Sequence, residues 1–173
     1  MGQVGLQGVE VQRATAGEWR ESRDLRLEML ADSPRSFLDG LNEVERWDDE
    51  RWQARMRSHT APDSVIIAAV ADRRWVGQAS GRIFSDTEPP RAYALAVYVS
   101  PQWRGRGLAA RLVGGVGEWA AGLGIGALHL DVHEDARPAI ASYLRQGFVF
   151  TGERSEHPNH PGEWELEMVR ALR

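Results

Sequence analysis

The segment Tyr93–Ala110, which reads YALAVYVSPQWRGRGLAA, has the clearest capacity for chemistry in this sequence. An apolar stretch leads into a loop with two glycines and two arginines, and a helix is predicted to begin at the glycines. The first turn of a helix presents unpaired backbone N–H groups and a partial positive charge, which together bind phosphate. Gly105 and Gly107 remove side chains that would block a close approach. Arg104 and Arg106 add positive charge, so the segment predicts an anion site that fits a pyrophosphate.

The same glycines also match a dinucleotide-binding fingerprint. Gly105–Ala110 fits the pattern G-x-G-x-x-A, and Asp131 lies downstream, where an acidic residue can bind a ribose. However, the segment lies in the middle of the chain, after a predicted antiparallel hairpin. Only one strand–helix–strand unit follows it, and the chain is too short for the second half of that fold. A dinucleotide site is therefore the weaker interpretation.

Two motifs together resemble the GNAT family of N-acetyltransferases. The acyl-CoA signature of that family, Gln/Arg-x-x-Gly-x-Gly/Ala, is matched by Gln102–Gly107. A second block of the family, Asn-x-x-Ala-x-x-x-Tyr-x-x-x-Gly-Phe, is matched at Ala139, Tyr143, Gly147 and Phe148. The asparagine of that block is replaced here by Ala136. The order of the predicted elements agrees with the family along almost the whole chain, from Val9 to Val169.

The resemblance implies an acetyl-CoA site without a metal ion. Backbone groups of Val97 and Val99 would pair with the pantetheine arm as an added strand does. Backbone N–H groups from Gln102 to Leu108 would hold the pyrophosphate. The cofactor-binding residues that the resemblance implies are Val97, Tyr98, Val99, Gln102, Trp103, Arg104, Gly105, Arg106, Gly107, Leu108, Ala136 and Tyr143.

The resemblance further implies direct transfer of an acetyl group to a primary amine. A strand N–H near Val97 would stabilise the oxyanion, and Tyr143 would protonate the leaving thiolate. A free amine has a pKa of about 10, so a base must remove a proton from it. The chain contains no cysteine, which argues against an acyl-cysteine intermediate. The candidate bases are Asp131, His133, Glu134, Asp39, Glu43 and water that leads to a distant carboxylate.

Several alternatives stay open at this point. Tyr143 is either the general acid or an ordinary core aromatic, and Phe37 and Leu38 either line an acceptor pocket or dock their own loop. The acceptor is a small molecule or a peptide: small amines, amino acids, antibiotics, peptide N-termini and protein lysines all fit. A non-catalytic acyl-CoA-binding or regulatory module is the alternative function, because the base is unassigned and Ala136 departs from the family. The resemblance also allows a homodimer.

Composition excludes other classes of protein. The chain has 173 residues, which suits one domain, and its balance of 42% hydrophobic and 27% charged residues is that of a globular protein. Its net charge of −4 disfavours nucleic-acid binding, which depends on neutralising phosphates. The lack of cysteine excludes disulfides and thiolate metal sites. Neither a membrane-spanning run nor a signal peptide is visible, so we expect a cytoplasmic protein.

A mixed α/β sheet must position these motifs. Hydrophobic patterns with a period of two and short apolar runs predict strands over 9–13, 64–71, 75–85, 91–99, 127–132, 148–153 and 164–169. Helices are predicted over 15–30, where Thr15–Glu18 forms a capping box, and over 48–59, 105–121 and 134–145, with a loop over 33–45. The element order is βααβββαβαββ. We expect one domain over 1–173, with residues 1–8 flexible and with about four helices flanking a mostly antiparallel sheet of about seven strands.

Overall fold

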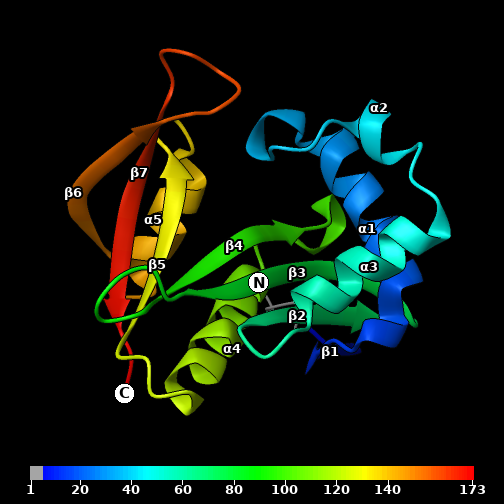
Figure 1. The fold of residues 1–173 in the computed structure, drawn as a ribbon, viewed down its shortest axis with the longest axis horizontal. Coiled ribbons are helices and arrows are strands. Elements are labelled where there is room, and N and C mark those ends of the chain that lie inside the picture. The colour runs from blue at the N-terminus through cyan, green and yellow to red at the C-terminus, as the bar shows by residue number, and fades with distance from the viewer. Residues whose placement is uncertain (1–5) are drawn as a thin grey trace, which may run out of the picture.

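A seven-stranded sheet forms the centre of the computed structural model, which describes residues 6–173 (Figure 1). Its strands are β1 (Val9–Arg13), β2 (Ser64–Ala71), β3 (Arg74–Phe84), β4 (Arg91–Val99), β5 (Ala127–His133), β6 (Val149–Glu156) and β7 (Trp164–Ala171). They lie in the order β1-β2-β3-β4-β5-β7-β6, and only the β4–β5 pair is parallel. The predicted mixed, mostly antiparallel sheet is confirmed.

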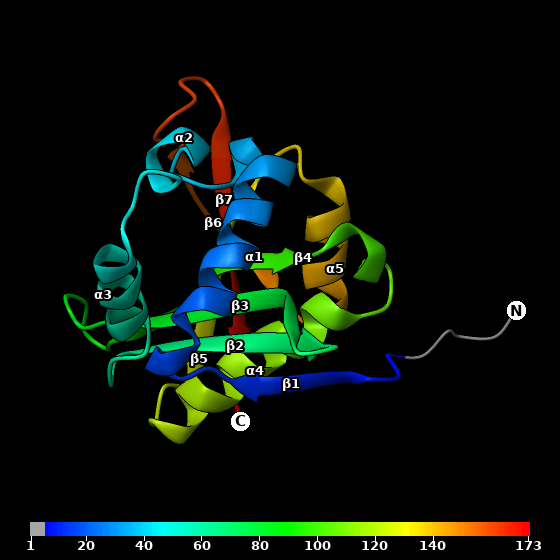
Figure 2. The same ribbon diagram turned by 90° about the vertical axis from the view of Figure 1, so that its right-hand side faces the viewer.

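Helices cover both faces of this sheet. The longer ones are α1 (Trp19–Asp32), α3 (Asp49–His59), α4 (Leu108–Gly122) and α5 (Arg137–Arg145). Figure 2 shows α1 and α4 on opposite sides of the strands. Strand β2 contributes to the core on both faces, because side chains two residues apart share a face. Val65 and Ile67 belong to the core beneath α4, and Ile66 and Ala68 belong to the core beneath α1 and α3.

Helix boundaries differ from the prediction in several places. The predicted loop over 33–45 contains the one-turn helix α2 (Leu41–Val44) and a 3₁₀ turn. Helix α4 begins at Leu108 and not at residue 105, because Gly105 and Gly107 have φ of 73° and 77°, which a right-handed helix cannot include. Helix α5 follows Ala136, so neither of the acidic residues before it serves as the predicted cap.

The predicted capping box of the first helix forms, but α1 itself begins at Trp19 and not at Thr15. The backbone N–H of Thr15 donates to the Glu18 carboxylate at 2.7 Å, although a 3₁₀ turn over Ala16–Glu18 precedes α1. The segment predicted to be flexible, residues 1–8, precedes β1, and its residues 1–5 lie outside the described residues. Residues 7–8 form a turn before β1.

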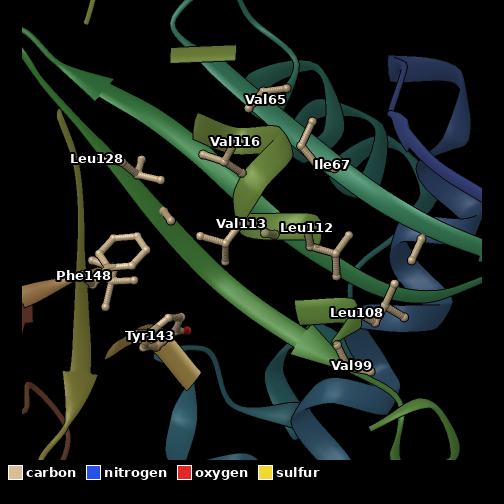
Figure 3. Close-up of a cluster of buried hydrophobic side chains, with 14 of the residues drawn as sticks. Val65, Ile67, Val99, Leu108, Leu112, Val113, Val116, Leu128, Tyr143 and Phe148 are labelled. Atoms are coloured by element: carbon tan, nitrogen blue, oxygen red, sulfur yellow. The ribbon is translucent and has the colours of Figure 1, made fainter. Parts of the chain in front are cut away.

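Glycines in α4 allow that helix to pack closely on the sheet. A Cβ added at Gly115 would lie 3.0 Å from Ile67, and one at Gly117 would lie 2.9 Å from Arg170. A Cβ at Gly114 would meet nothing within 4 Å. Of the four glycines in α4, Gly115 and Gly117 therefore lie in close contact with neighbouring side chains, and Gly114 and Gly122 do not. Figure 3 shows the aliphatic side chains of α4 gathered against the sheet.

No helix within residues 6–173 is long and apolar enough to cross a membrane.

Candidate functional site

The strands β4 and β5 pair only briefly before they diverge. Their Cα partners are Ala92–Leu128 and Tyr93–His129, whereas β4 continues to Val99 and β5 to His133. Figure 1 shows the two strands separating toward their C-terminal ends. From residue 94 onward, the backbone of β4 on the β5 side has no strand partner among the described residues. Unpaired strand edges of this kind can pair with an extended ligand.

A β-bulge lies in the same part of β4. Tyr98 pairs with Gln78 and Leu95 pairs with Ser80, so two residues of β4 stand opposite one residue of β3. Ala96, in the bulge, has φ of 48°, which is uncommon for a residue with a side chain. Bulges of this kind turn backbone and side-chain groups in a new direction and are frequent beside active sites.

A pocket of about 600 Å³ opens where β4, α4 and α5 meet. Its lining residues are Val97, Tyr98, Val99, Trp103, Arg104, Gly105, Gly107, Leu108, Ala109, Ala110, Pro138, Ala139, Ser142, Tyr143 and Arg145. Most of the predicted cofactor-binding residues, including Tyr143, therefore lie around one cavity although two helices and a strand supply them.

Three predicted residues do not line this pocket. Gln102 lines a different cavity, beside α1. Arg106 is exposed and stacks over the ring of Trp103 at 5.2 Å. Ala136 directly precedes α5.

Sequence reasoning missed the rest of the α5 wall. Pro138, Ser142 and Arg145 lie on one face of α5, at a spacing of four and three residues, and all three line the pocket. Ala139 lies one turn before Tyr143 on the same helix. The helical period counted from Tyr143 could have found Ala139, whereas Pro138, Ser142 and Arg145 follow from their own spacing of four and three residues.

The loop before α4 forms a cradle that fits a phosphate group. Gly105 and Gly107 have left-handed φ values, and a Cβ added at either would meet nothing within 4 Å, so their surfaces are open. Gly107 is the N-cap of α4, and the first N–H groups of the helix after it have no partner within the helix. The helix dipole adds a partial positive charge at this end. The local backbone therefore has the open surface and the unpaired N–H groups that an anion site needs.

Arg104 is fixed beside this cradle by groups from distant parts of the chain. Its Nε donates to the Val99 carbonyl oxygen at 2.8 Å, and its guanidinium forms an ion pair with Asp32 of α1. Hydrogen bonds from Arg104 and then from Ser33 lower the pKa of Asp32. The positive charge of Arg104 is thus partly neutralised, and its plane stacks over Tyr98 at 5.5 Å.

Tyr143 lies at the inner end of the pocket and is 8% exposed. Its ring meets Phe148 edge to face at 5.7 Å, and Figure 3 shows the Phe148 ring between Tyr143 and Leu128. Burial alone raises the pKa of the Tyr143 hydroxyl to about 12. The hydroxyl is therefore protonated at neutral pH and can donate a proton.

The candidate bases differ in the hydrogen bonds and ion pairs that their side chains already make. His133 uses both ring nitrogens, since Nε2 lies 2.8 Å from the Glu163 carboxylate and Nδ1 accepts the Asp135 N–H at 3.2 Å. Glu134 accepts the backbone N–H of Trp164 at 3.2 Å. These contacts hold the β6–β7 loop against the end of β5, and they leave the two side chains poorly placed to take up another proton.

Two further candidates are paired with arginines. Asp39 accepts from Arg26 at 2.7 Å, and Glu43 accepts from Arg51 at 3.3 Å. Both carboxylates are therefore already engaged by guanidinium groups.

Asp131 is in a different electrostatic environment. Loss of hydration is the first cause that raises its pKa to about 6, and the negative charges of Glu165 and Glu167 add to it. Asp131 pairs with Glu167 across β5 and β7 and lies on the sheet face opposite Leu128 and Leu130. Tyr143 belongs to the core on the Leu128 side, so Asp131 and Tyr143 lie on opposite faces of the sheet where β4 and β5 diverge.

Two loops meet beside the face of the sheet that carries Asp131, which is the open face. Arg35 forms an ion pair with Glu163, and the Asn159 side chain donates to the Leu38 carbonyl oxygen at 3.0 Å. Phe37 packs edge to face on Tyr98 at 6.4 Å and so docks its own loop, whereas Leu38 is 62% exposed. The loop after α1 and the β6–β7 loop therefore form one boundary of the open face.

The part of the chain from residue 6 onward contains no group of three metal-ligating side chains.

Comparison with known proteins agrees with this geometry. The model of the family described as "Acetyltransferase (GNAT) family" matches residues 26–148. No curated protein matches the chain.

Solved structures with the same fold include three acetyltransferases. A GNAT-family acetyltransferase from Streptococcus pneumoniae aligns with a TM-score of 0.76 and 13% identity over 95% of this chain and 99% of that one. A phosphinothricin acetyltransferase from Sinorhizobium meliloti, in complex with acetyl-CoA, has a TM-score of 0.76 and 18% identity over 96% and 89%. A ribosomal-protein-alanine N-acetyltransferase from Brucella melitensis has a TM-score of 0.76 and 19% identity over 94% and 99%. At these identities the likeness shows the fold.

Proposed function

The chain belongs to the acetyltransferase (GNAT) family, and we propose that it transfers an acetyl group from acetyl-CoA to a primary amine. One observation carries this proposal: the phosphate cradle, the unpaired edge of β4 and the Tyr143 hydroxyl all border a single pocket. The Sinorhizobium meliloti relative was crystallised with acetyl-CoA. The non-catalytic alternative is not favoured, because this chain retains a protonated hydroxyl and an available carboxylate beside the diverging strands.

Three parts of the pocket suit three parts of acetyl-CoA. The backbone N–H groups that follow Gly107 would bind the pyrophosphate, with Arg106 and Arg145 adding charge. The unpaired edge of β4 at Val97 and Val99 would pair with the amides of the pantetheine arm. The thioester would then lie beside the bulge in β4, where a backbone N–H near Val97 can stabilise the oxyanion.

Acid and base groups on opposite faces of the sheet suit the chemistry of this transfer. The amine nitrogen attacks the thioester carbonyl carbon from the open face, the new C–N bond forms and the C–S bond breaks. Asp131, directly or through water, takes the proton that the amine loses. Tyr143 gives its proton to the thiolate of CoA on the other face. Because no cysteine is present, the acetyl group passes directly between the two bound substrates.

We propose that the acceptor is a small-molecule or peptide amine. The names of the relatives from Sinorhizobium meliloti and Brucella melitensis indicate one acceptor of each kind. The loop after α1 and the β6–β7 loop border the open face and would contact the acceptor. We also propose a single cytoplasmic domain over 1–173, and a homodimer is a further expectation for which the oligomeric state in solution is the measurement.

The decisive experiment combines Tyr143→Phe with an acetyl-CoA binding assay. Acetyl transfer to a panel of amines is followed by release of free CoA thiol. General acid catalysis contributes about 10²–10⁴-fold, so Tyr143→Phe should lose most of its turnover. Stabilisation of the variant by acetyl-CoA in thermal unfolding should persist, since the phenyl ring still fills the pocket wall.

Other outcomes would overturn parts of the proposal. Unchanged turnover in Tyr143→Phe would remove the hydroxyl from the reaction. Failure of acetyl-CoA to stabilise the unmodified protein, together with stabilisation by NADH or NADPH, would restore the dinucleotide interpretation of Gly105–Ala110.

A further inference from the structure

Two arginines lie on the inner faces of α1 and α3, on the side of the sheet opposite α4 (Figure 2). On α3, Arg55 and His59 follow the buried Trp52 by three and seven residues, so they share the helix face that packs on the core. On α1, the side chain of Arg26 is itself only 7% exposed. Neither arginine lines the acetyl-CoA pocket, and the proposed transfer gives no role to either.

These two guanidinium groups share a single carboxylate. Arg26 donates to Asp39 at 2.7 Å and stacks over Phe37 at 5.1 Å, and its Nε is buried without a hydrogen-bond partner. Within residues 6–173, the Arg55 side chain forms no ion pair and donates no hydrogen bond. One of the two positive charges therefore lacks a partner.

The pKa shifts of α3 agree with this arrangement. Loss of hydration is the first cause that lowers the pKa of Arg55 to about 10; the positive charge of Arg26 adds to it, and the negative charge of Asp39 opposes it. Burial and then the charge of Arg55 lower the pKa of His59 to about 4, and Arg26 and the exposed Arg82 act in the same direction. At neutral pH both buried arginines are charged and His59 is neutral.

The unbalanced charge calls for a ligand with one negative charge. A charged side chain that is removed from water is normally paired, because an unpaired charge in the interior is costly. A carboxylate carries one negative charge, and its two oxygens match the fork of donors on a guanidinium group. A phosphate monoester carries about 1.5 to 2 negative charges and would overcompensate the cluster.

This arginine pair borders the face from which the amine would attack. Phe37, over which Arg26 stacks, packs edge to face on Tyr98 at 6.4 Å and belongs to the same apolar cluster as Ala96 of the β4 bulge. The loop that contains Phe37 borders the open face. Asp131 lies on that face as well, since its side chain points away from the core beneath α4.

We propose that Arg26 and Arg55 bind the carboxylate of the acceptor, so that the acceptor is a free amino acid. This inference rests on the proposed acetyl transfer. The carboxylate would lie between the two arginines and the amine toward Asp131, which turns the nitrogen toward the thioester. A simple amine has no group for the arginines to bind. In a protein N-terminus the carboxylate next to the amine is lost to the peptide bond, so such acceptors do not fit either.

The test compares matched acceptors in the assay for released CoA thiol. Each pair consists of an amino acid and the amine that lacks only its carboxylate: phenylalanine with phenethylamine, leucine with isoamylamine, and alanine with ethylamine. For at least one pair, the kcat/KM of the amino acid should exceed that of its amine by about 10- to 100-fold, the range expected from a hydrogen bond to a charged group.

Arg55→Gln should remove this preference by raising the KM for the amino acid. Its Tm should not fall, because the change removes a charge that repels Arg26. The matched control is Arg57→Gln, on the same helix, because Arg57 is exposed and its loss changes the net charge of the protein equally. The control should keep the preference for the amino acid.

Equal kcat/KM for every amino acid and its matched amine would overturn the inference and leave the proposed transfer in place. A preference that persists in Arg55→Gln, or that Arg57→Gln loses equally, would also overturn it. If no acceptor releases thiol, the proposed transfer itself fails. Calorimetric titration with the same amino acids then tests the anion site alone: binding that only Arg55→Gln weakens supports the site, and the absence of binding overturns it.

Discussion

Gly107→Ala separates the role of the cradle in ligand binding from its role in folding. Gly107 has φ of 77°, and a Cβ added there would meet no atom within 4 Å. The substitution therefore creates no clash in the protein without bound acetyl-CoA. It does place a methyl group on the backbone surface where the pyrophosphate would approach. We expect a small loss of stability and a large loss of acetyl-CoA affinity.

The two effects can be estimated separately. A left-handed conformation costs a residue with a side chain about 1–2 kcal/mol, and the restricted unfolded chain returns about 0.4–1 kcal/mol. The net loss is about 1 kcal/mol, which lowers the Tm by about 2–4 °C in a chain of this size. Losing one hydrogen bond to a charged phosphate costs about 1.5–3 kcal/mol, which weakens acetyl-CoA binding by about 10- to 100-fold.

Gly124→Ala provides a matched control at the other end of α4. Gly124 has φ of 80°, and its added Cβ would also meet nothing within 4 Å. Calorimetric unfolding should show the same loss of Tm in both variants, and titration with acetyl-CoA should show weak binding only in Gly107→Ala. Equal affinity in the two variants would refute the assignment of the cradle. A much larger loss of stability in Gly107→Ala alone would show that the glycine serves the fold.

Further predictions concern pH and packing. If Asp131 is the base, a pH–rate profile should show activity rising with pH through an apparent pKa of about 6. Asp131→Asn should remove this rise. Glu165→Gln should move the rise to lower pH, because the negative charge of Glu165 raises the pKa of Asp131. Gly81→Ala should lower the unfolding free energy by about 1–3 kcal/mol, because its Cβ would lie 2.7–2.9 Å from three core side chains. Gly114→Ala, where the space is open, should raise it by about 0.5–1 kcal/mol in urea unfolding. Burial lowers the pKa of His59 to about 4, so between pH 6.5 and pH 4 the unfolded chain binds more protons than the folded chain does. The Tm should therefore fall from pH 6.5 toward pH 4, and His59→Gln should flatten this fall.

The sequence could predict the sheet and the cradle because local patterns determine both. Two-residue alternation placed β1, β2 and β4 at their observed bounds. The position of the glycines before an amphipathic helix indicated the anion site, since the chemistry of a helix N-terminus depends on neighbouring residues only. Local errors lay at the ends of elements: at the start of α4, for example, the positive φ of Gly105 and Gly107 delays the first helical residue to Leu108.

The electrostatic details of the site could not be predicted, because they join residues far apart in the chain. The Arg104–Asp32 pair spans 72 residues, and the Arg35–Glu163 pair spans 128. No spacing rule predicts such contacts. For the same reason the candidate bases looked alike in the sequence. Only the fold shows that His133 is engaged by Glu163, whereas the Asp131 carboxyl lies beside other carboxylates that raise its pKa.

In the proposed function, the divergence of β4 and β5 leaves the two substrates to different structural elements. The proposed cofactor pocket uses backbone groups of β4 together with the first turns of α4 and one face of α5, all attached to the core that contains Phe148 and Leu128. The open face is bordered by two loops that are held to each other by the Arg35–Glu163 pair. Loops tolerate change more readily than packed helices do. We therefore expect exchange of the β6–β7 loop to alter the KM for the amine and to leave the Kd for acetyl-CoA unchanged. A parallel loss of both affinities would show that the two faces form a single unit.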